Sequence, residues 1–170
     1  PGGGKPRPLG LAAPGRGKPA RHCADLAPEE VRDVVGGLGE KPCRARQRAA
    51  RYYAHLTRDP GAMTDRPKAT RDVLAEALFP PLLTAARRME ADGGTTVKTL
   101  WHLFDGAKVE SVLMRYPQRS TLCVSSQAGC GMACPFCATG QLGLTRNLSV
   151  AEIVEQVRSA ARSLADGEIP

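Results

Sequence analysis

The sequence predicts an α/β fold whose parts follow one another along the chain: a small helical domain, a β-hairpin, and a strand–loop–helix unit. Three observations support this prediction. Apolar residues recur at helical spacing between residues 25 and 79, two alternating apolar runs flank Asp105-Gly106, and a further strand pattern leads through a cysteine-rich loop into an amphipathic helix. The 170 residues suffice for one modest domain or for pieces of two.

Residues 1–22 are rich in proline, glycine, arginine and lysine and contain no acidic residue. Such a segment has too few apolar side chains to offset the entropy that is lost on folding. We therefore expect a flexible basic tail over residues 1–22 and a helical domain over residues 23–80.

Helical patterns occur three times within residues 23–80. The first begins at Pro28, a residue favoured at the first position of a helix, and the third follows Pro67 with Thr64 as a candidate cap. The second, residues 43–58, carries four arginines that fit either a phosphate-binding face or a solvated face: Arg44, Arg46, Arg48 and Arg51. We expect Cys23 to be an incidental thiol and Cys43 to lie in the core.

Residues 81–118 predict a β-hairpin connection. A strand is favoured at 82–91, and strands at 97–104 and 108–116 are joined by the Asp105-Gly106 turn signal. Glu110 stands among apolar residues of the last of these strands. An outward-facing position is the default for a single glutamate in an alternating run.

Residues 119–170 predict one strand–loop–helix unit. The strand spans 120–125, and the helix begins at the capping box formed by Ser149 and Glu152 and ends near Gly167. Apolar residues of the helix predict a buried stripe that comprises Ile153, Val154, Val157, Ala160, Ala161 and Leu164.

The loop from Ala128 to Gly140 places thiols at Cys130, Cys134 and Cys137, a C-x3-C-x2-C spacing. Thiolates this close on one loop can converge on a single metal centre. A disulfide is disfavoured because three close cysteines cannot pair evenly, and a zinc site is disfavoured because no fourth Cys or His lies nearby. A [4Fe–4S] cluster that leaves one iron open fits three thiolates best, with zinc as the alternative.

Charge and composition narrow the function classes. The formal net charge of +7 suits a polyanionic partner such as RNA, although a solvated basic surface would give the same value. Six cysteines, three of them at cluster spacing, favour a reducing compartment. No apolar run approaches the roughly 18 residues of a membrane span, so we expect a cytoplasmic protein without a membrane partner.

The pattern C-x3-C-x-aromatic-C, completed by Phe136, resembles the signature of the radical S-adenosyl-L-methionine (SAM) enzymes. The resemblance implies that Cys130, Cys134 and Cys137 bind a [4Fe–4S] cluster whose open iron chelates SAM. It also implies that Phe136 packs beside the adenine of SAM.

The run TLCVSSQAGCGMACPFCATGQLGLTRNL, Thr121 to Leu148, resembles the RlmN family in particular, and a weaker resemblance extends from about Arg21 to the C-terminus. The family methylates C2 of an adenosine in 23S ribosomal RNA, in the peptidyl transferase centre, and in some members in transfer RNA. The resemblance implies an incomplete radical SAM (β/α) barrel of which 119–170 is the first βα unit. It also implies a helical accessory domain that binds RNA and a flavodoxin-type electron donor.

Family chemistry implies roles for two further residues. A 5′-deoxyadenosyl radical activates a methylcysteine, the RNA is linked to that cysteine, and a proton acceptor and a second thiol release the product. Glu110, in the motif VESVL, matches the proton acceptor, and Cys123 matches the thiol that forms a disulfide with the methyl-carrying cysteine. That cysteine and most of the barrel are expected beyond Pro170, since a (β/α)8 barrel needs roughly 250 residues. The fragment alone is therefore expected to be inactive.

Two alternatives stay open at this point. A Cfr-like methyltransferase that modifies C8 of adenosine shares the cluster motif, the additional cysteine and the glutamate. A non-catalytic, metal-containing RNA-binding module would share only the metal ligands.

Overall fold

The computed structural model describes residues 19–41, 43, 49–50, 52–54, 56 and 68–170. Most of the expected basic tail lies outside these residues. The four arginines expected on the second helix (Arg44, Arg46, Arg48 and Arg51) and the expected cap Thr64 also lie outside the described residues.

Among its described residues, the helical part includes a 3-10 turn, η1 (Cys23–Asp25), and the helices α1 (Pro28–Gly37) and α3 (Lys68–Leu78). Residues 43, 49–50 and 52–53, within the predicted second helix, are also helical. Pro28 occupies the start of α1 as predicted, and the side chain of Glu30 accepts a 2.8 Å hydrogen bond from the Ala27 backbone N–H. This bond satisfies one of the donors that a helix leaves unpaired at its N-terminus.

A small core holds the helical part together: Cys23, Val35, Tyr52, Leu78 and Phe79. The prediction that Cys43 lies in the core was wrong, whereas nothing tests the prediction that Cys23 is an incidental thiol. Cys23 is buried in this core, whereas Cys43 is exposed. His22, which the sequence places in the tail, is only 2% exposed and packs against Tyr52 and Phe79.

The central element is a four-stranded sheet of β1 (Leu83–Ala91), β2 (Thr96–Leu103), β3 (Lys108–Tyr116) and β4 (Arg119–Cys123), in the order β1-β2-β3-β4. The strand favoured at 82–91 and the hairpin around Asp105-Gly106 are confirmed. All three neighbouring pairs are antiparallel. The expected hairpin is thus the middle of a larger sheet, and the strand expected to open a barrel is its edge.

No parallel strand pair occurs among the described residues. The reason is topological: a parallel pair needs a crossover to a second strand, and α5 (Val150–Ala165) is the last element described. The barrel part of the predicted fold class is therefore not formed by these residues, whereas the mixed α/β character is confirmed.

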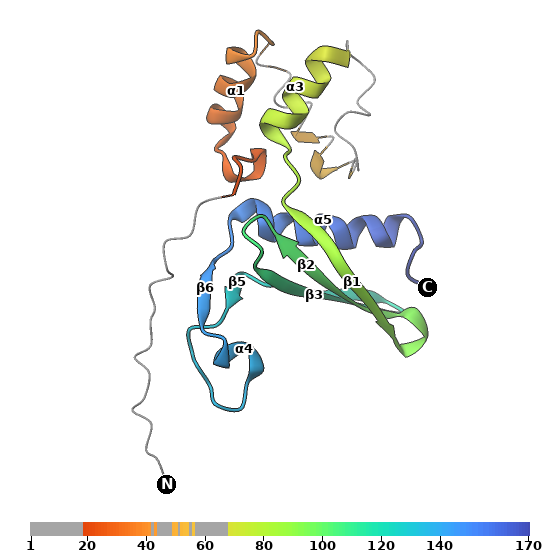
Figure 1. Cartoon of the computed structure of the whole chain (residues 1–170). Coiled ribbons are helices and arrows are strands. Elements are labelled where there is room, and N and C mark those ends of the chain that lie inside the picture. Colours follow the sequence, from red (N-terminus) through yellow and green to blue (C-terminus); the bar gives the residue numbers. More distant parts are fainter. Residues whose placement is uncertain (1–18, 42, 44–48, 51, 55, 57–67) are drawn as a thin grey trace.

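Helix α5 lies between the helical part and one face of the sheet (Figure 1). Val154 packs against the core of the helical part, and Leu164 packs against Val97, Leu113 and Ile169 on the sheet side. The carboxylate of Asp25 accepts a 2.8 Å hydrogen bond from the Ala151 N–H in the first turn of α5. The helix therefore joins the two parts of the chain.

The start and end of α5 follow the sequence prediction, but its buried surface does not. Ser149 caps the helix and forms the predicted box with Glu152, and Gly167 follows it with φ of 67°. Val157, expected in the buried stripe, is 48% exposed, while Glu152 and Gln156 are fully buried. Because α5 is covered from two sides, its most deeply buried positions do not form a single apolar stripe.

The described residues include neither a membrane-spanning helix nor a disulfide. Within the part of the chain that the structure describes, no helix is both long enough and apolar enough to cross a membrane. All six cysteines are free thiols, so the disulfide that the resemblance implies for Cys123 has no support in this structure.

Candidate functional site

The cysteine loop is closed at its base by a short antiparallel ribbon of β5 (Gln127–Gly129) and β6 (Leu144–Asn147). Gly129 is required here for two reasons. Its φ is 78°, and a Cβ at this position would lie 2.0 Å from the Gly143 carbonyl oxygen. The Cys130 N–H donates to the same oxygen at 3.1 Å. The two arms of the loop, β5 with Cys130 and Gly143 with β6, are therefore hydrogen-bonded directly beside the first cysteine.

Within the loop, the chain folds back on the second cysteine. The Cys137 N–H donates to the Cys134 carbonyl at 3.2 Å, and the side chain of Gln141 donates to the Pro135 carbonyl at 2.6 Å. Gly140, in the short helix α4 (Ala138–Gln141), lies so close that a Cβ would be 2.9 Å from the Cys134 nitrogen. The backbone therefore brings the second and third cysteines close together.

Ala133 introduces local strain between the first two cysteines. Its φ is 50°, in the left-handed region that residues with a Cβ rarely adopt. Such strained positions cluster at functional sites, where the surrounding contacts hold them in place.

The donor chemistry of the loop fits an iron–sulfur cluster. Three thiolates without a fourth protein ligand match a cluster that keeps one iron open, whereas closed zinc sites use four ligands. The side chains of Cys130, Cys134 and Cys137 are half-buried, and no group of three His, Cys, Asp or Glu residues is gathered at ligating geometry within the described part of the chain. The fit therefore lies in the ligand types and in the tight backbone.

Large apolar side chains stand out from the loop around the cysteines. Phe136 is 88% exposed, Met132 65% and Leu142 84%. Phe136 directly precedes the third cysteine and is the most exposed of these three side chains.

The structure places Glu110 and Cys123 on one face of the sheet, the face opposite α5. Cys123 pairs with Val112, and Glu110 lies two residues from Val112 on the same strand. Alternate residues of a strand share a face, so Glu110 and Cys123 occupy diagonal positions on adjacent strands. Both side chains are exposed, and the Glu110 carboxylate is 2.8 Å from the Lys98 ammonium on β2.

Hydrogen bonds of Ser125, two residues beyond β4, connect β3 to helix α5. The Ser125 hydroxyl donates to the Glu110 carbonyl at 2.7 Å. Both backbone groups of Ser125 bond the side chain of Gln156: its N–H donates to Oε1 at 2.9 Å, and its carbonyl accepts from Nε2 at 2.8 Å. Sequence reasoning missed Gln156, because a glutamine within a helix gives no local signal of a partner 31 residues away.

Arg146 on β6 forms a second buried network that sequence reasoning missed. Its guanidinium donates to both carboxylate oxygens of Glu152 at 2.8 Å and to Asp105 in the β2–β3 turn at 2.8 Å. Hydrogen bonding to Glu152 raises the pKa of Arg146, and the hydrogen bond from Arg146 lowers the pKa of Asp105. The only sequence signal was the capping box, which indicated Glu152 as a cap alone.

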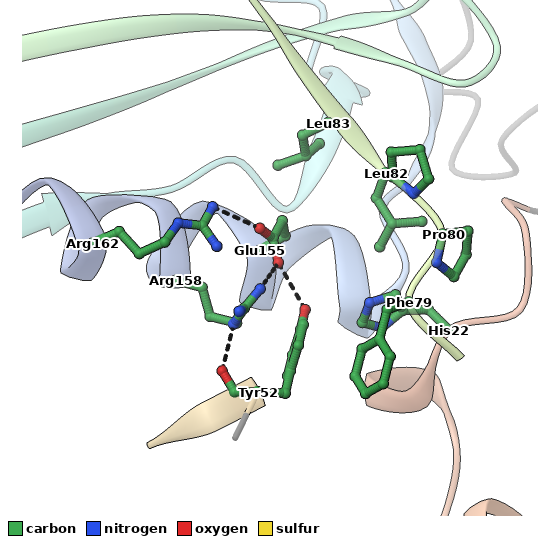
Figure 2. Close-up of a pocket in the computed structure, with 10 residues that line it drawn as sticks. His22, Tyr52, Phe79, Pro80, Leu82, Leu83, Glu155, Arg158 and Arg162 are labelled. Atoms are coloured by element: carbon green, nitrogen blue, oxygen red, sulfur yellow. Dashed lines mark hydrogen bonds and ion pairs between the residues drawn. The ribbon is translucent and has the colours of Figure 1, made fainter. Parts of the chain in front are cut away.

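A cavity of about 270 Å³ lies elsewhere, between the helical part and α5 (Figure 2). Glu155 points into it and bonds the Tyr52 hydroxyl at 2.7 Å and Arg162 at 2.9 Å, and it also pairs with Arg158. The Arg158 guanidinium stacks on the Tyr52 ring at 3.4 Å and donates to the Tyr52 carbonyl. None of the site residues expected from the sequence lines this cavity.

Sequence comparison identifies closely similar proteins. The chain is 62% identical over 164 residues to the "Probable dual-specificity RNA methyltransferase RlmN" of Thermobifida fusca (strain YX). The matched segment covers 96% of this chain and 45% of that protein. It is 64% identical over 153 residues to the protein of the same name from Mycobacterium ulcerans (strain Agy99), with 90% of this chain and 42% of that protein covered. The chain thus spans less than half the length of these relatives.

Structural comparison agrees with this result. A crystal structure of a radical SAM methyltransferase from Sphaerobacter thermophilus matches with a TM-score of 0.80 and 43% sequence identity, covering 87% of this chain and 43% of that chain. No model of a protein family matches the chain.

Proposed function

We propose that this chain, which belongs to the RlmN family of dual-specificity RNA methyltransferases, forms the cluster-binding and proton-transfer part of a radical SAM RNA methyltransferase. The observation that carries the proposal is the register of β3 and β4, which places Glu110 and Cys123 on one sheet face directly before the three-cysteine loop. Each group has a separate task in this proposal.

Cys130, Cys134 and Cys137 are the residues proposed to hold the [4Fe–4S] cluster, and Phe136 the residue proposed to contact SAM. When bound, the cluster supplies the electron that cleaves SAM. The chain supports this role with a tight loop in which Gly129 and Gly140 allow backbone contacts that any Cβ would block. Reduced thiols are needed for such ligation, so a cytoplasmic location is part of the proposal.

Glu110 is proposed to accept the proton from C2 of the adenine during product release. Its carboxylate is accessible and forms an ion pair with the Lys98 ammonium at 2.8 Å. Cys123 is proposed to act as a thiol at the same site, since it lies diagonally across from Glu110 on the same face. An exposed thiol and an exposed carboxylate can both reach a base that approaches this face.

The proposed substrate is an adenosine of 23S ribosomal RNA and, given the dual specificity in the names of the relatives, also of transfer RNA. The net charge of +7 supports a nucleic-acid partner through attraction to phosphate. An external one-electron donor of the flavodoxin type completes the proposal.

The test is the response of the anaerobically reconstituted chain to SAM. We expect SAM to change the visible absorbance of the wild-type chain and of Cys123→Ala, but not of Cys134→Ala, which lacks a proposed ligand. A metal-loaded chain that binds RNA and shows no response to SAM would refute the enzymatic proposal and favour a non-catalytic module. Analysis of RNA methylated by the full-length protein then separates a C2 product from a C8 product.

A further inference from the structure

The two most deeply buried polar side chains of α5 lie one helical turn apart. Glu152 and Gln156 are both 0% exposed, and the Gln156 amide also donates to the Glu152 carbonyl at 3.2 Å. Burying such groups costs free energy unless their hydrogen bonds are satisfied. Apolar side chains would fill these positions without this desolvation cost. The hydrogen-bond partners of Glu152 and Gln156 therefore indicate what the two residues do.

Gln156 bonds the chain that leads into the cysteine loop. Its side-chain amide accepts a hydrogen bond from the Ser125 N–H at 2.9 Å and donates one to the Ser125 carbonyl at 2.8 Å. A residue on a neighbouring β-strand would bond the same two backbone groups. Ser125 lies two residues after Cys123 and two residues before β5. This amide therefore fixes the backbone between the candidate thiol and the first arm of the loop.

Glu152 holds the other arm. Its two carboxylate oxygens each accept a hydrogen bond from Arg146 at 2.8 Å, and Arg146 lies on β6, opposite Ala128 of β5. The capping bond of Glu152 to the Ser149 N–H needs only one of these oxygens. Capping alone therefore does not explain the buried, two-oxygen contact with Arg146.

We propose that Glu152 and Gln156 are positioning residues that hold the two arms of the cysteine loop at a fixed separation and register. Through Ser125, which bonds the Glu110 carbonyl at 2.7 Å, the same helix also sets the loop relative to Glu110 and Cys123. The expected effect on cluster binding rests on the proposed function, whereas the positioning of the loop backbone does not.

The first test is backbone amide exchange, measured residue by residue on the metal-free 170-residue chain. In Gln156→Leu, the Ser125 amide should exchange on the order of tenfold faster, because its one described acceptor is lost. In Glu152→Gln, the Cys130 amide, which bonds Gly143 across the arms, should exchange faster by a similar factor. Val157→Leu, at an exposed position of the same helix, should change neither amide.

A general loss of structure would accelerate exchange throughout the chain, so Gln156→Met provides a second variant of similar length and flexibility. Acceleration confined to Ser125 and its neighbours in either Gln156 variant supports the proposal. An unchanged rate at Ser125 in both variants, or equal acceleration at β1 and β2, overturns it.

The second test is the iron and sulfide bound after anaerobic reconstitution. Gln156→Leu and Glu152→Gln should retain several-fold less cluster than wild type and Val157→Leu after equal exposure to a chelator. Equal retention in all four proteins overturns the proposal. If the wild-type chain binds no iron, the proposed function fails, and the exchange result alone decides the positioning role.

Discussion

Replacing Arg146 by methionine should cause one of the largest losses of stability available in this chain. The side chain of Arg146 is 7% exposed, and the carboxylates that it pairs are 0% exposed for Glu152 and 10% for Asp105. Methionine keeps an apolar stem but removes the guanidinium, so both acids lose this cation. Breaking a buried pair in this way costs about 3–5 kcal/mol.

The assay is thermal and denaturant unfolding of the 170-residue chain, with its cysteines kept reduced. For a chain of this size each kcal/mol lowers the melting temperature by roughly 2–4 °C, so the expected loss is roughly 6–20 °C. Arg88→Met is the matched control, because Arg88 is 36% exposed in its pair with Glu168 and should contribute only about 0–1 kcal/mol.

A double variant tests whether the loss arises from the unpaired charge. Arg146→Met combined with Glu152→Leu removes both members of the buried pair and should recover part of the stability lost in the single variant. A loss below about 1 kcal/mol in Arg146→Met, equal to that of Arg88→Met, would refute the account of this network.

Three further predictions follow from single positions. Gly129→Ala should destabilise the chain by more than about 1 kcal/mol in denaturant unfolding, because its φ is positive and its Cβ would meet the Gly143 carbonyl; an unchanged midpoint contradicts this. Burial raises the pKa of Cys23 to about 12, so peptide mapping after brief alkylation should find Cys123 labelled and Cys23 intact; equal labelling contradicts the burial. Burial lowers the pKa of His22 below its unfolded value of 6.5, so His22 contributes stability above pH 6.5 that is lost as pH falls from 6.5 through the folded pKa. His22→Asn, which keeps a side-chain acceptor for the Ala24 N–H, should flatten that slope in unfolding measured against pH, and an unaltered slope would point to another group.

Local signals in the sequence predicted much of the fold. The Asp105-Gly106 turn and the alternating runs on either side define the β2–β3 hairpin, since turn chemistry and alternation are properties of neighbouring residues. The Ser149–Glu152 capping box likewise predicted the start of α5. Short elements such as β5, β6 and α4 were missed, because three or four residues carry no measurable periodicity.

Residue spacing could predict a candidate site only where the residues are close in sequence, and the resemblance to a known family supplied Glu110 and Cys123. The spacing of Cys130, Cys134 and Cys137 pointed to one metal centre without any knowledge of the fold. In contrast, the residues that support the loop bond partners far along the chain: Gln156 contacts Ser125 across 31 residues, and Arg146 contacts Asp105 across 41. The burial of such polar side chains depends on tertiary packing, which no local pattern reports.

The central claim is that three cysteines of one loop hold an iron–sulfur cluster, and ligand-resolved metal analysis tests it most directly. The wild-type chain and Cys123→Ala, reconstituted without oxygen, should each bind about four irons and four sulfides, and Cys134→Ala should lose them. A single zinc per chain without sulfide, or iron binding that survives in Cys134→Ala, would contradict the account.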